Sequence, residues 1–256
     1  MKKFHFTFDK TKKAQNLKKI IFKKYINNSP KNSDIIIVAG GDGFMLHSLK
    51  KYVKFKKPFY GINCGTYGFL MNKYISEKFE NKIYKAKKTI INPLQITSFN
   101  NKIYKKILIA VNEVSLFRQT KQTASLKLEI GKKTLIKKLI GDGVLISTPA
   151  GSTAYNLSVH GPILSLNSGK LAITPISPFR PRRWKGKIIS NKVKIKLTNL
   201  DPQKRPVAVV ADNIEIRNIK TLNIKVNKNI NLTLLHDPER SLVKRIKIEQ
   251  LRRNFN

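Results

Sequence analysis

The four residues Gly40-Gly41-Asp42-Gly43 put a single carboxylate into a segment that is otherwise nearly bare backbone. They directly follow the apolar run 34–39. Glycines let main-chain N–H groups approach phosphate oxygens closely, whereas the charge of Asp42 repels phosphate. The acid must therefore accept a proton from a hydroxyl group or hold a metal ion that bridges phosphates. This combination predicts phosphoryl transfer and hence a kinase.

A second unusual segment covers residues 141–162, with the sequence GDGVLISTPAGSTAYNLSVHGP. After Gly141-Asp142-Gly143 and a short apolar strand, small hydroxyl residues surround Pro149 and Gly151. We expect a tight loop with uncommitted donors and acceptors, followed by a helix over 152–159 whose N-terminal N–H groups face an anion. Ser and Thr are also common helix caps without any ligand. The length of the run favours a nucleotide or dinucleotide.

Asn112 and Glu113 follow the apolar run 107–111. Neighbouring residues of a strand point to opposite faces, unless a bulge or a strand end lets both reach one ligand. An amide and a carboxylate together suit a ribose diol. Taken alone, the pair fits a solvent-facing strand end better.

The first ninety residues alternate between strand and helix patterns. Strands are predicted at 3–8, 34–39 and 58–63, and helices at 12–26, 43–53 and 75–87. Short connections between alternating strands and helices predict an α/β domain, a parallel sheet with flanking helices. In such sheets ligands bind beyond the carboxyl ends of the strands, where the glycine segment lies.

After about residue 90 the hydrophobic period changes from helical to alternating. A strand pattern also covers 187–198, and the chain closes with a helix after Asp237-Pro238. Many short strands with polar turns predict a β-rich, sandwich-like domain. Hairpins are predicted for 94–99 with 103–110, 124–130 with 134–140, 206–210 with 214–219, and 222–226 with 230–235.

The composition fits a globular protein and limits its location. The chain of 256 residues has 41% hydrophobic residues and no apolar run near the ~18 residues that cross a bilayer. We expect no signal peptide, since basic and polar residues follow Met1. Cys64 is the only cysteine, which excludes an internal disulfide and a multi-cysteine zinc site. A reducing compartment, the cytoplasm, is the expected location.

The net charge of +38 arises from 52 basic and 14 acidic residues. A polyanionic partner would explain it, but the lysines are scattered through every segment, which favours a compositional habit of the coding sequence. The field would still attract anionic substrates. A basic nucleic-acid-binding protein stays an alternative, although no DNA or RNA motif supports it.

Taken together, these motifs closely resemble the NAD kinase family. The matching segments are GGDG at 40–43, GTYGFL at 65–70, NE at 112–113, GDGVLISTPAGSTAYNLS at 141–158 and GPI at 161–163. ITPISP at 173–178 and Asp212 add weaker matches. GGDG alone also occurs in lipid kinases and phosphofructokinases, so a lipid or sugar kinase is the alternative enzyme. The combination of segments in this order is specific.

The resemblance implies phosphorylation of the 2′-hydroxyl of the adenosine ribose of NAD, giving NADP, with ATP or polyphosphate as donor and Mg²⁺ or another divalent metal. It makes Asp42 the catalytic base. It implies an α/β domain of residues 1–90 with 237–256 and a β-rich NAD-binding domain of residues 91–236. It also implies a homo-oligomer, a dimer or tetramer. We expect no specific nucleic acid and no membrane as partner, since the sequence has no DNA or RNA motif and no apolar run long enough to span a bilayer.

The resemblance further assigns the binding residues. Glycines of the first loop hold phosphates, Phe69 lines the adenine pocket, and Asn112 and Glu113 contact ribose and pyrophosphate groups. Asp142 holds the nicotinamide end. The segment 147–158, rich in small hydroxyl residues and called the hydroxyl loop below, surrounds the adenosine part. Ser177 and Asn213 make further contacts that often cross subunits. The binding residues are thus Gly40, Gly41, Gly43, Phe69, Asn112, Glu113, Asp142, Thr153, Ala154, Tyr155, Ser158, Ser177 and Asn213.

Overall fold

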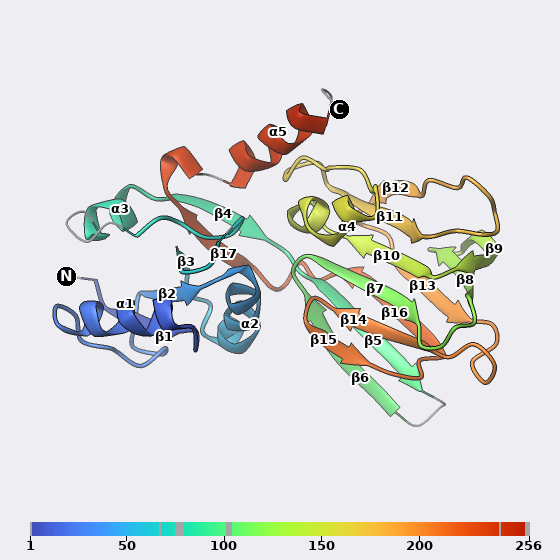
Figure 1. Cartoon of the computed structure of the whole chain (residues 1–256), viewed down its shortest axis with the longest axis horizontal. Helices are drawn as coiled ribbons and strands as arrows, with labels where there is room; N and C mark the ends of the chain where they lie inside the picture. Colours follow the sequence, from blue (N-terminus) through green and yellow to red (C-terminus); the bar gives the residue numbers. More distant parts are fainter. Residues whose placement is uncertain (1, 67, 75–78, 101–103, 241, 254–256) are drawn as a thin grey trace. The chain divides into compact units, whose positions relative to one another are not determined.

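The computed structural model describes residues 2–66, 68–74, 79–100, 104–240 and 242–253 (Figure 1). The chain divides into two compact units. Unit 1 comprises residues 1–91 and 229–248, and unit 2 comprises residues 92–228 and 249–256.

Unit 1 is built on a five-stranded sheet in the order β1-β2-β3-β17-β4. The first four of these strands run parallel and β4 runs antiparallel to β17. The strands are β1 (Phe4–Phe8), β2 (Ile35–Gly40), β3 (Phe59–Asn63), β4 (Lys87–Ile91) and β17 (Leu232–His236). Every residue of β2 is buried, as expected for an inner strand of a parallel sheet covered on both faces.

Four helices accompany this sheet along the chain (Figure 1). They are α1 (Lys12–Phe22), α2 (Asp42–Tyr52), α3 (Phe79–Lys85) and α5 (Leu242–Arg253), with single 3₁₀ turns at Val53–Phe55 and Pro238–Arg240. In α1, Ala14, Leu17 and Ile21 form the buried face. Phe4 and Phe6 of β1 pack edge-on against one another and join the same core. Burial of such side chains contributes about 1.5–3 kcal/mol each.

Unit 2 consists of two six-stranded sheets. One has the order β12-β11-β10-β7-β14-β15, and the other β6-β5-β16-β13-β8-β9. Their strands are β5 (Leu94–Asn100), β6 (Tyr104–Ala110), β7 (Glu113–Arg118), β8 (Ala124–Ile130), β9 (Lys133–Gly141), β10 (Gly143–Ser147), β11 (Lys170–Ile176), β12 (Lys187–Ser190), β13 (Ile195–Asn199), β14 (Val207–Ala211), β15 (Ile214–Ile216) and β16 (Thr221–Val226).

A single hydrophobic core joins the two sheets of unit 2. It includes Ile96 of β5 and Leu197 of β13 from one sheet, and Leu116 of β7 and Ile146 of β10 from the other. Alternating strands bury one face each, so two sheets packed on one core satisfy the pattern. The predicted fold class, an α/β part with a parallel sheet and a β-rich sandwich-like part, is confirmed.

The hairpins β5–β6, β8–β9 and β14–β15 form as predicted. The predicted pairing of 222–226 with 230–235 is wrong: β16 pairs with β5 and β13, whereas β17 joins the sheet of unit 1. The chain thus returns to unit 1 at residue 229, not at 237. Two strands of alternating hydrophobicity joined by a polar turn can form a hairpin, but they can equally belong to two different units. The local pattern therefore does not identify the partner strand.

The predicted single strand over 187–198 is also wrong. A turn separates β12, which pairs with β11, from β13, which pairs with β8 and β16 in the other sheet. The alternation does not reveal this change of sheet, because Ile189 of β12 and Ile195 of β13 are both buried and lie an even number of residues apart.

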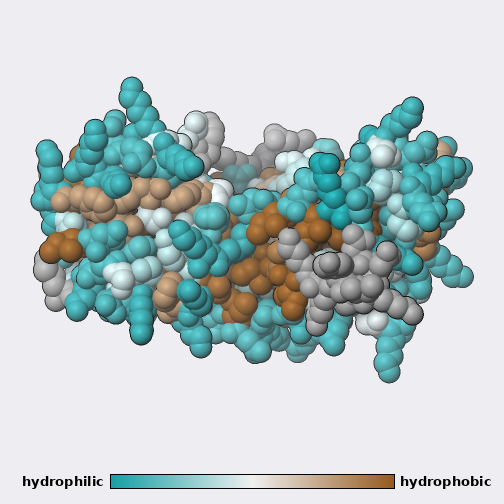
Figure 2. All heavy atoms as spheres, turned by 90° about the horizontal axis from the view of Figure 1, so that it is seen from below, coloured by the Kyte–Doolittle hydropathy of each residue, from teal (hydrophilic) through white to brown (hydrophobic). Residues whose placement is uncertain are grey.

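Hydrophilic side chains cover most of the face shown in Figure 2, consistent with 52 lysine and arginine residues in the chain. Among the helices that the structure describes, none combines the length and apolar character needed to cross a membrane.

Asn72 fixes the segment that follows β3. Its fully buried side chain donates to Leu235 O at 3.0 Å and accepts from Asp237 N at 3.0 Å. Its backbone bonds to Gly61 and Asn63 of β3. Asn72 is therefore tied to the carboxyl ends of both β3 and β17.

We expect Asn72→Ala to lower the free energy of unfolding by about 1–3 kcal/mol, because it leaves a buried carbonyl and a buried N–H without partners. Urea unfolding midpoints measure the effect. Asn16→Ala, at an exposed position of α1, is the matched control and should change stability by less than about 0.5 kcal/mol. Equal midpoints for the two variants would contradict the role given to Asn72.

Candidate active site

The first glycine segment lies where β2 ends and α2 begins. Gly40 ends β2, Gly41 is the N-cap of α2, and Asp42 is its first residue. A Cβ atom on Gly40 would lie 2.8 Å from the Phe44 side chain, so packing requires this glycine. A Cβ on Gly41 or Gly43 would meet no described atom within 4 Å. These two glycines leave open space at the N-terminus of a helix, where N–H groups and the helix dipole favour an anion.

The Asp42 carboxylate is held in a fixed orientation by two backbone amides. Phe69 N donates to Oδ2 at 2.6 Å and Leu70 N donates to Oδ1 at 2.9 Å. Burial raises the pKa of Asp42, whereas these amides and the charge of Arg245 lower it, with burial the larger effect. A carboxylate has about four acceptor positions, so it keeps capacity for a hydroxyl proton. Asp42 is thus an oriented base, stronger than an ordinary aspartate.

Arg245, on α5, binds the carbonyl groups of the segment whose N–H groups bind Asp42. Sequence reasoning missed this residue. Its guanidinium donates to Gly68 O at 2.7 Å, to Met71 O at 2.6 Å and to Phe69 O. No signal separates it in the sequence from the other basic residues of 244–253. Phe69, assigned to the adenine pocket by resemblance, contributes its backbone N–H to Asp42, and its side chain is half-buried.

In unit 2, Asn112 and Glu113 lie at the junction between β6 and β7. Asp212 organises this junction: its carboxylate accepts from Val111 N at 2.9 Å, Asn112 N at 2.8 Å and Glu113 N at 3.3 Å. Asp212 adopts a φ of 53°, in the turn between β14 and β15. Sequence reasoning gave Asp212 only a weak match and no role. Its role could not be assigned without knowing that it lies in the two-residue turn between β14 and β15, next to the start of β7.

Two buried atoms of this junction have no hydrogen-bond partner among the described residues: Asn112 Oδ1 and Glu113 Oε2. Burial and the nearby charge of Asp212 raise the pKa of Glu113 to about 8. Glu113 is therefore largely protonated at pH 7 and can both donate and accept. Orphaned buried polar atoms are rare in native proteins and require an explanation. A polar ligand such as a ribose or phosphate group would satisfy both.

The hydroxyl loop packs directly against this junction. Thr148 Oγ1 donates to Val111 O at 2.8 Å, and Thr148 N donates to Asn112 O at 2.9 Å. A Cβ on Gly151 would lie 2.2 Å from Asn112 O, so only glycine permits this contact. The structure thus brings the loop and the Asn112-Glu113 pair together.

The hydroxyls of this loop are less available than the sequence suggests. Ser147, Thr148 and Ser152 are buried and donate to backbone carbonyls, which makes the prediction of a loop of uncommitted groups wrong for them. The predicted helix over 152–159 is a 3₁₀ turn (Ala150–Thr153) and a four-residue helix, α4 (Tyr155–Ser158). Of the binding residues expected in this segment, Thr153, Ala154 and Tyr155 are partly exposed and Ser158 is exposed.

Asp142 and Tyr155 lie near the same junction. Asp142 Oδ1 accepts from Arg118 Nε at 2.5 Å. The Tyr155 ring lies 5.8 Å from that of Phe117, and burial, Asp142 and Glu113 raise its pKa. Asp142, Glu113 and Tyr155 are therefore close enough to interact electrostatically.

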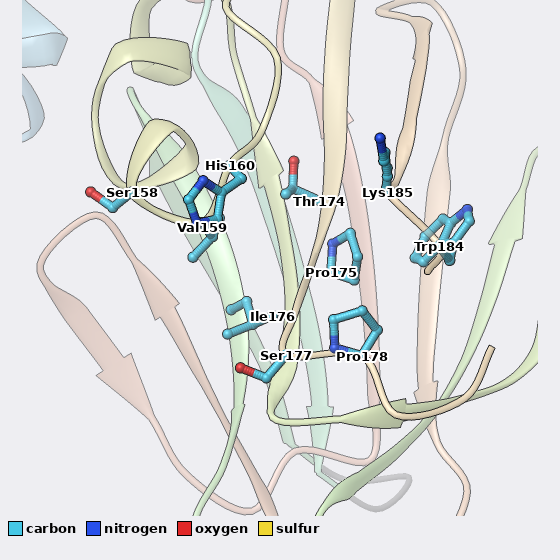
Figure 3. A pocket seen from close by; sticks show the side chains of 10 residues that line it. All are labelled: Ser158, Val159, His160, Thr174, Pro175, Ile176, Ser177, Pro178, Trp184 and Lys185. Carbon is cyan, nitrogen blue, oxygen red and sulfur yellow. The ribbon is translucent and has the colours of Figure 1, made fainter. Parts of the chain in front are cut away.

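Ser158 and Ser177 line one pocket of about 420 Å³ within unit 2. Figure 3 shows these two serines on one side of the pocket and Trp184 and Lys185 on the other. The half-buried Trp184 forms a wall of the pocket. Asn213 is exposed and follows Asp212 in the β14–β15 turn.

Glu113 makes stability depend on pH. The unfolded carboxyl ionises near its ordinary pKa of 4.5, whereas the folded one keeps its proton until about pH 8. The folded state binds more protons between these values, so its stability falls as pH rises through that window.

We expect the wild type to lose stability relative to Glu113→Gln as pH rises from about 5 to about 8, measured by urea unfolding. Glu215→Gln, at an exposed position of β15, is the control and should follow the wild type. A wild type and a Glu113→Gln variant with parallel pH dependence would contradict the raised pKa.

Comparisons with known proteins bear on both units. Residues 1–90 match the family model of the ATP-NAD kinase N-terminal domain, and residues 111–237 match that of the ATP-NAD kinase C-terminal domain. An NAD kinase of Caulobacter vibrioides is 42% identical over 237 residues, covering 93% of this chain and 91% of the relative. An NAD kinase of Xylella fastidiosa is 44% identical over 237 residues, with the same coverage.

Two solved structures share the fold. The crystal structure of an NAD kinase from Archaeoglobus fulgidus in complex with ATP superposes with a TM-score of 0.73 at 22% identity, covering 93% of this chain and 95% of that one. Yeast NADH kinase complexed with NADH gives 0.74 at 21% identity, covering 89% and 69%. The identity and coverage of the curated relatives, together with the two family models, place the chain in the NAD kinase family.

Proposed function

We propose that this protein transfers the γ-phosphoryl group of ATP to the 2′-hydroxyl of the adenosine ribose of NAD, giving NADP and ADP. The observation that carries the proposal is Asp42: an oriented carboxylate with a raised pKa, next to two glycines that leave open space at the start of α2. The relatives at 42% and 44% identity carry the name NAD kinase.

In the proposed reaction the 2′-oxygen of the ribose attacks the γ-phosphorus. The bond between that phosphorus and the bridging oxygen of ADP breaks, and the hydroxyl proton passes to Asp42. Base assistance of this kind contributes about 10²–10⁴-fold. Alignment and neutralisation of the phosphate charges supply most of the remainder. Gly41 and Gly43, which have open space beside them, would offer the backbone on which phosphate oxygens bind, whereas the buried Gly40 permits the close packing of Phe44.

We assign Mg²⁺, or another divalent metal, to the nucleotide, so that MgATP is the substrate. Magnesium keeps several waters and needs few protein ligands when phosphates hold it. The described residues contain no group of three or more His, Cys, Asp or Glu side chains that could hold a metal ion by themselves. This residue set is compatible with an ion that arrives on ATP.

The dinucleotide contacts are proposed in unit 2. The orphaned Asn112 Oδ1 and Glu113 Oε2 would bind ribose or pyrophosphate groups of NAD. Asp142, which faces Arg118, would hold the nicotinamide end, and Thr153, Ala154, Tyr155 and Ser158 would surround the adenosine part. Phe69 is proposed for adenine. Ser177 and Asn213 would make further contacts, which fits a homo-oligomer in which a neighbouring subunit completes the NAD site.

A lipid or sugar kinase is not favoured, because the curated relatives are named NAD kinase. Incubation of the purified protein with NAD and MgATP, followed by detection of NADP, tests the proposal. Diacylglycerol and a hexose serve as competing acceptors. Phosphorylation of either competitor without formation of NADP would overturn it. The cytoplasm is proposed as the location, since the one cysteine, Cys64, is buried and has no second cysteine to pair with.

Asp42→Asn should lower kcat by at least about 10²-fold, because the amide keeps the shape of the side chain but cannot take the proton. The Kd of NAD, measured by calorimetry, should change little. Asp34→Asn is the control on an exposed aspartate of the same unit and should keep wild-type turnover. Near-normal turnover in Asp42→Asn would remove the residue from the base role.

Asn112→Ala should weaken NAD binding by about 2-fold to 12-fold, because it removes one neutral hydrogen bond of about 0.5–1.5 kcal/mol. The KM for NAD and its calorimetric Kd measure the change, and the KM for ATP should stay constant. Asn223→Ala, at an exposed position of β16, is the matched control. Unchanged NAD affinity in Asn112→Ala would rule out the proposed contact.

A further inference from the structure

Two peptide groups lie between the Arg245 guanidinium and the Asp42 carboxylate. The first joins Gly68 to Phe69: its carbonyl accepts from Arg245 at 2.7 Å, and its N–H donates to Asp42 at 2.6 Å. The second joins Phe69 to Leu70: its carbonyl also accepts from Arg245, and its N–H donates to Asp42 at 2.9 Å. The same two planar units thus carry a cation at one end and an anion at the other.

This arrangement has a defined physical effect. A peptide group is planar and rigid, so a guanidinium that fixes its carbonyl also fixes the direction of its N–H. Hydrogen bonds in series polarise one another, which strengthens the bonds that each N–H gives to the carboxylate. The guanidinium is a rigid fork with five donors and is always charged, which a lysine does not reproduce. The charge of Arg245 lowers the pKa of Asp42 against the effect of burial.

The surroundings hold Arg245 in place. Leu242 and Ile246, on either side of it in α5, are buried. At the end of β17, His236 is fully buried, and burial with the charge of Arg245 lowers its pKa to about 4. The neighbouring Asp237 accepts from Tyr60 Oη at 2.7 Å and Lys82 Nζ at 2.8 Å. Asp237 is therefore already bonded to other groups, while His236 stays neutral at physiological pH.

We propose that Arg245 is a positioning residue for phosphoryl transfer, which orients the Asp42 carboxylate through the Gly68–Phe69 and Phe69–Leu70 peptide groups. The inference rests on the proposed function of Asp42 as base. It gives α5, at the far end of the chain, a part in the chemistry without any contact to substrate.

Arg245→Met removes the charge and the fork and keeps the length of the side chain. It should lower kcat on the order of 10²-fold, the loss expected when a catalytic group is misplaced by about 1 Å. The KM for NAD should change little. The acid limb of the kcat/KM profile should move to higher pH, because the pKa of Asp42 rises when the cation is removed.

Arg245→Lys keeps the charge without the fork. Its acid limb should stay near that of the wild type, while kcat falls to an intermediate value. Lys247→Met, at an exposed position of the same helix, is the matched control and should leave kcat and the acid limb of the kcat/KM profile unchanged. Because the pKa of His236 would rise in the same direction, the comparison is repeated in a His236→Gln background, where the shift caused by Arg245→Met should persist. Its disappearance there would overturn the inference.

Titration of the Asp42 carboxyl by ¹³C NMR gives a readout that needs no turnover. A higher Asp42 pKa in Arg245→Met than in the wild type supports the inference, and equal pKa values in the two proteins overturn it. If Arg245→Met does not fold, the Arg245→Lys protein decides: a kcat equal to that of the wild type overturns the inference. A wild type that makes no NADP would instead contradict the proposed function, and the titration would still test the coupling of Arg245 to Asp42.

Discussion

The orientation of one carboxylate depends on two backbone amides, and much of unit 1 serves to present them. Asp42 begins α2, and the amides come from the segment after β3. Asn72 ties that segment to the ends of β3 and β17, and Arg245 fixes its carbonyls. In its proposed role as base, Asp42 would need little reorganisation during the reaction, because the main chain already sets the direction of its carboxylate.

The candidate dinucleotide site of unit 2 follows the same rule with the charges reversed. There a carboxylate, Asp212, accepts three backbone amides and so fixes the chain that presents Asn112 and Glu113. Its charge also helps to keep Glu113 protonated, since two carboxylates so close disfavour a second ionisation. In each unit one charged side chain, Arg245 or Asp212, fixes the backbone that positions the groups proposed to bind substrate. Neither side chain needs to contact the substrate itself.

Local periodicity sufficed for most of the fold, because parallel strands and two-residue turns leave short-range patterns. It failed where the choice of partner is non-local, as for β17, whose alternation resembles that of a hairpin strand although it joins the sheet of unit 1. For the site, residue types that resemble a known family could be assigned from sequence. Arg245 could not, since its role depends on two carbonyl groups 176 and 177 residues away. Likewise, nothing in the sequence distinguishes the hydroxyl of Thr148, committed to Val111, from that of Thr153.

The two Gly-Asp-Gly segments illustrate why a motif has to be explained atom by atom. In 141–143 the glycines are required by packing: a Cβ on Gly143 would lie 1.8 Å from Leu116 O, and one on Gly141 would lie 2.8 Å from Ser177 O. In 41–43 the space beside both glycines is open. Identical letters therefore serve close strand packing in one unit and an accessible backbone in the other. The aspartates differ accordingly, since Asp142 faces a guanidinium directly whereas Asp42 meets one only through peptide groups. The carboxylate of Asp42 thus combines a direction fixed by two backbone amides with a raised pKa, and this combination suits its proposed role as base.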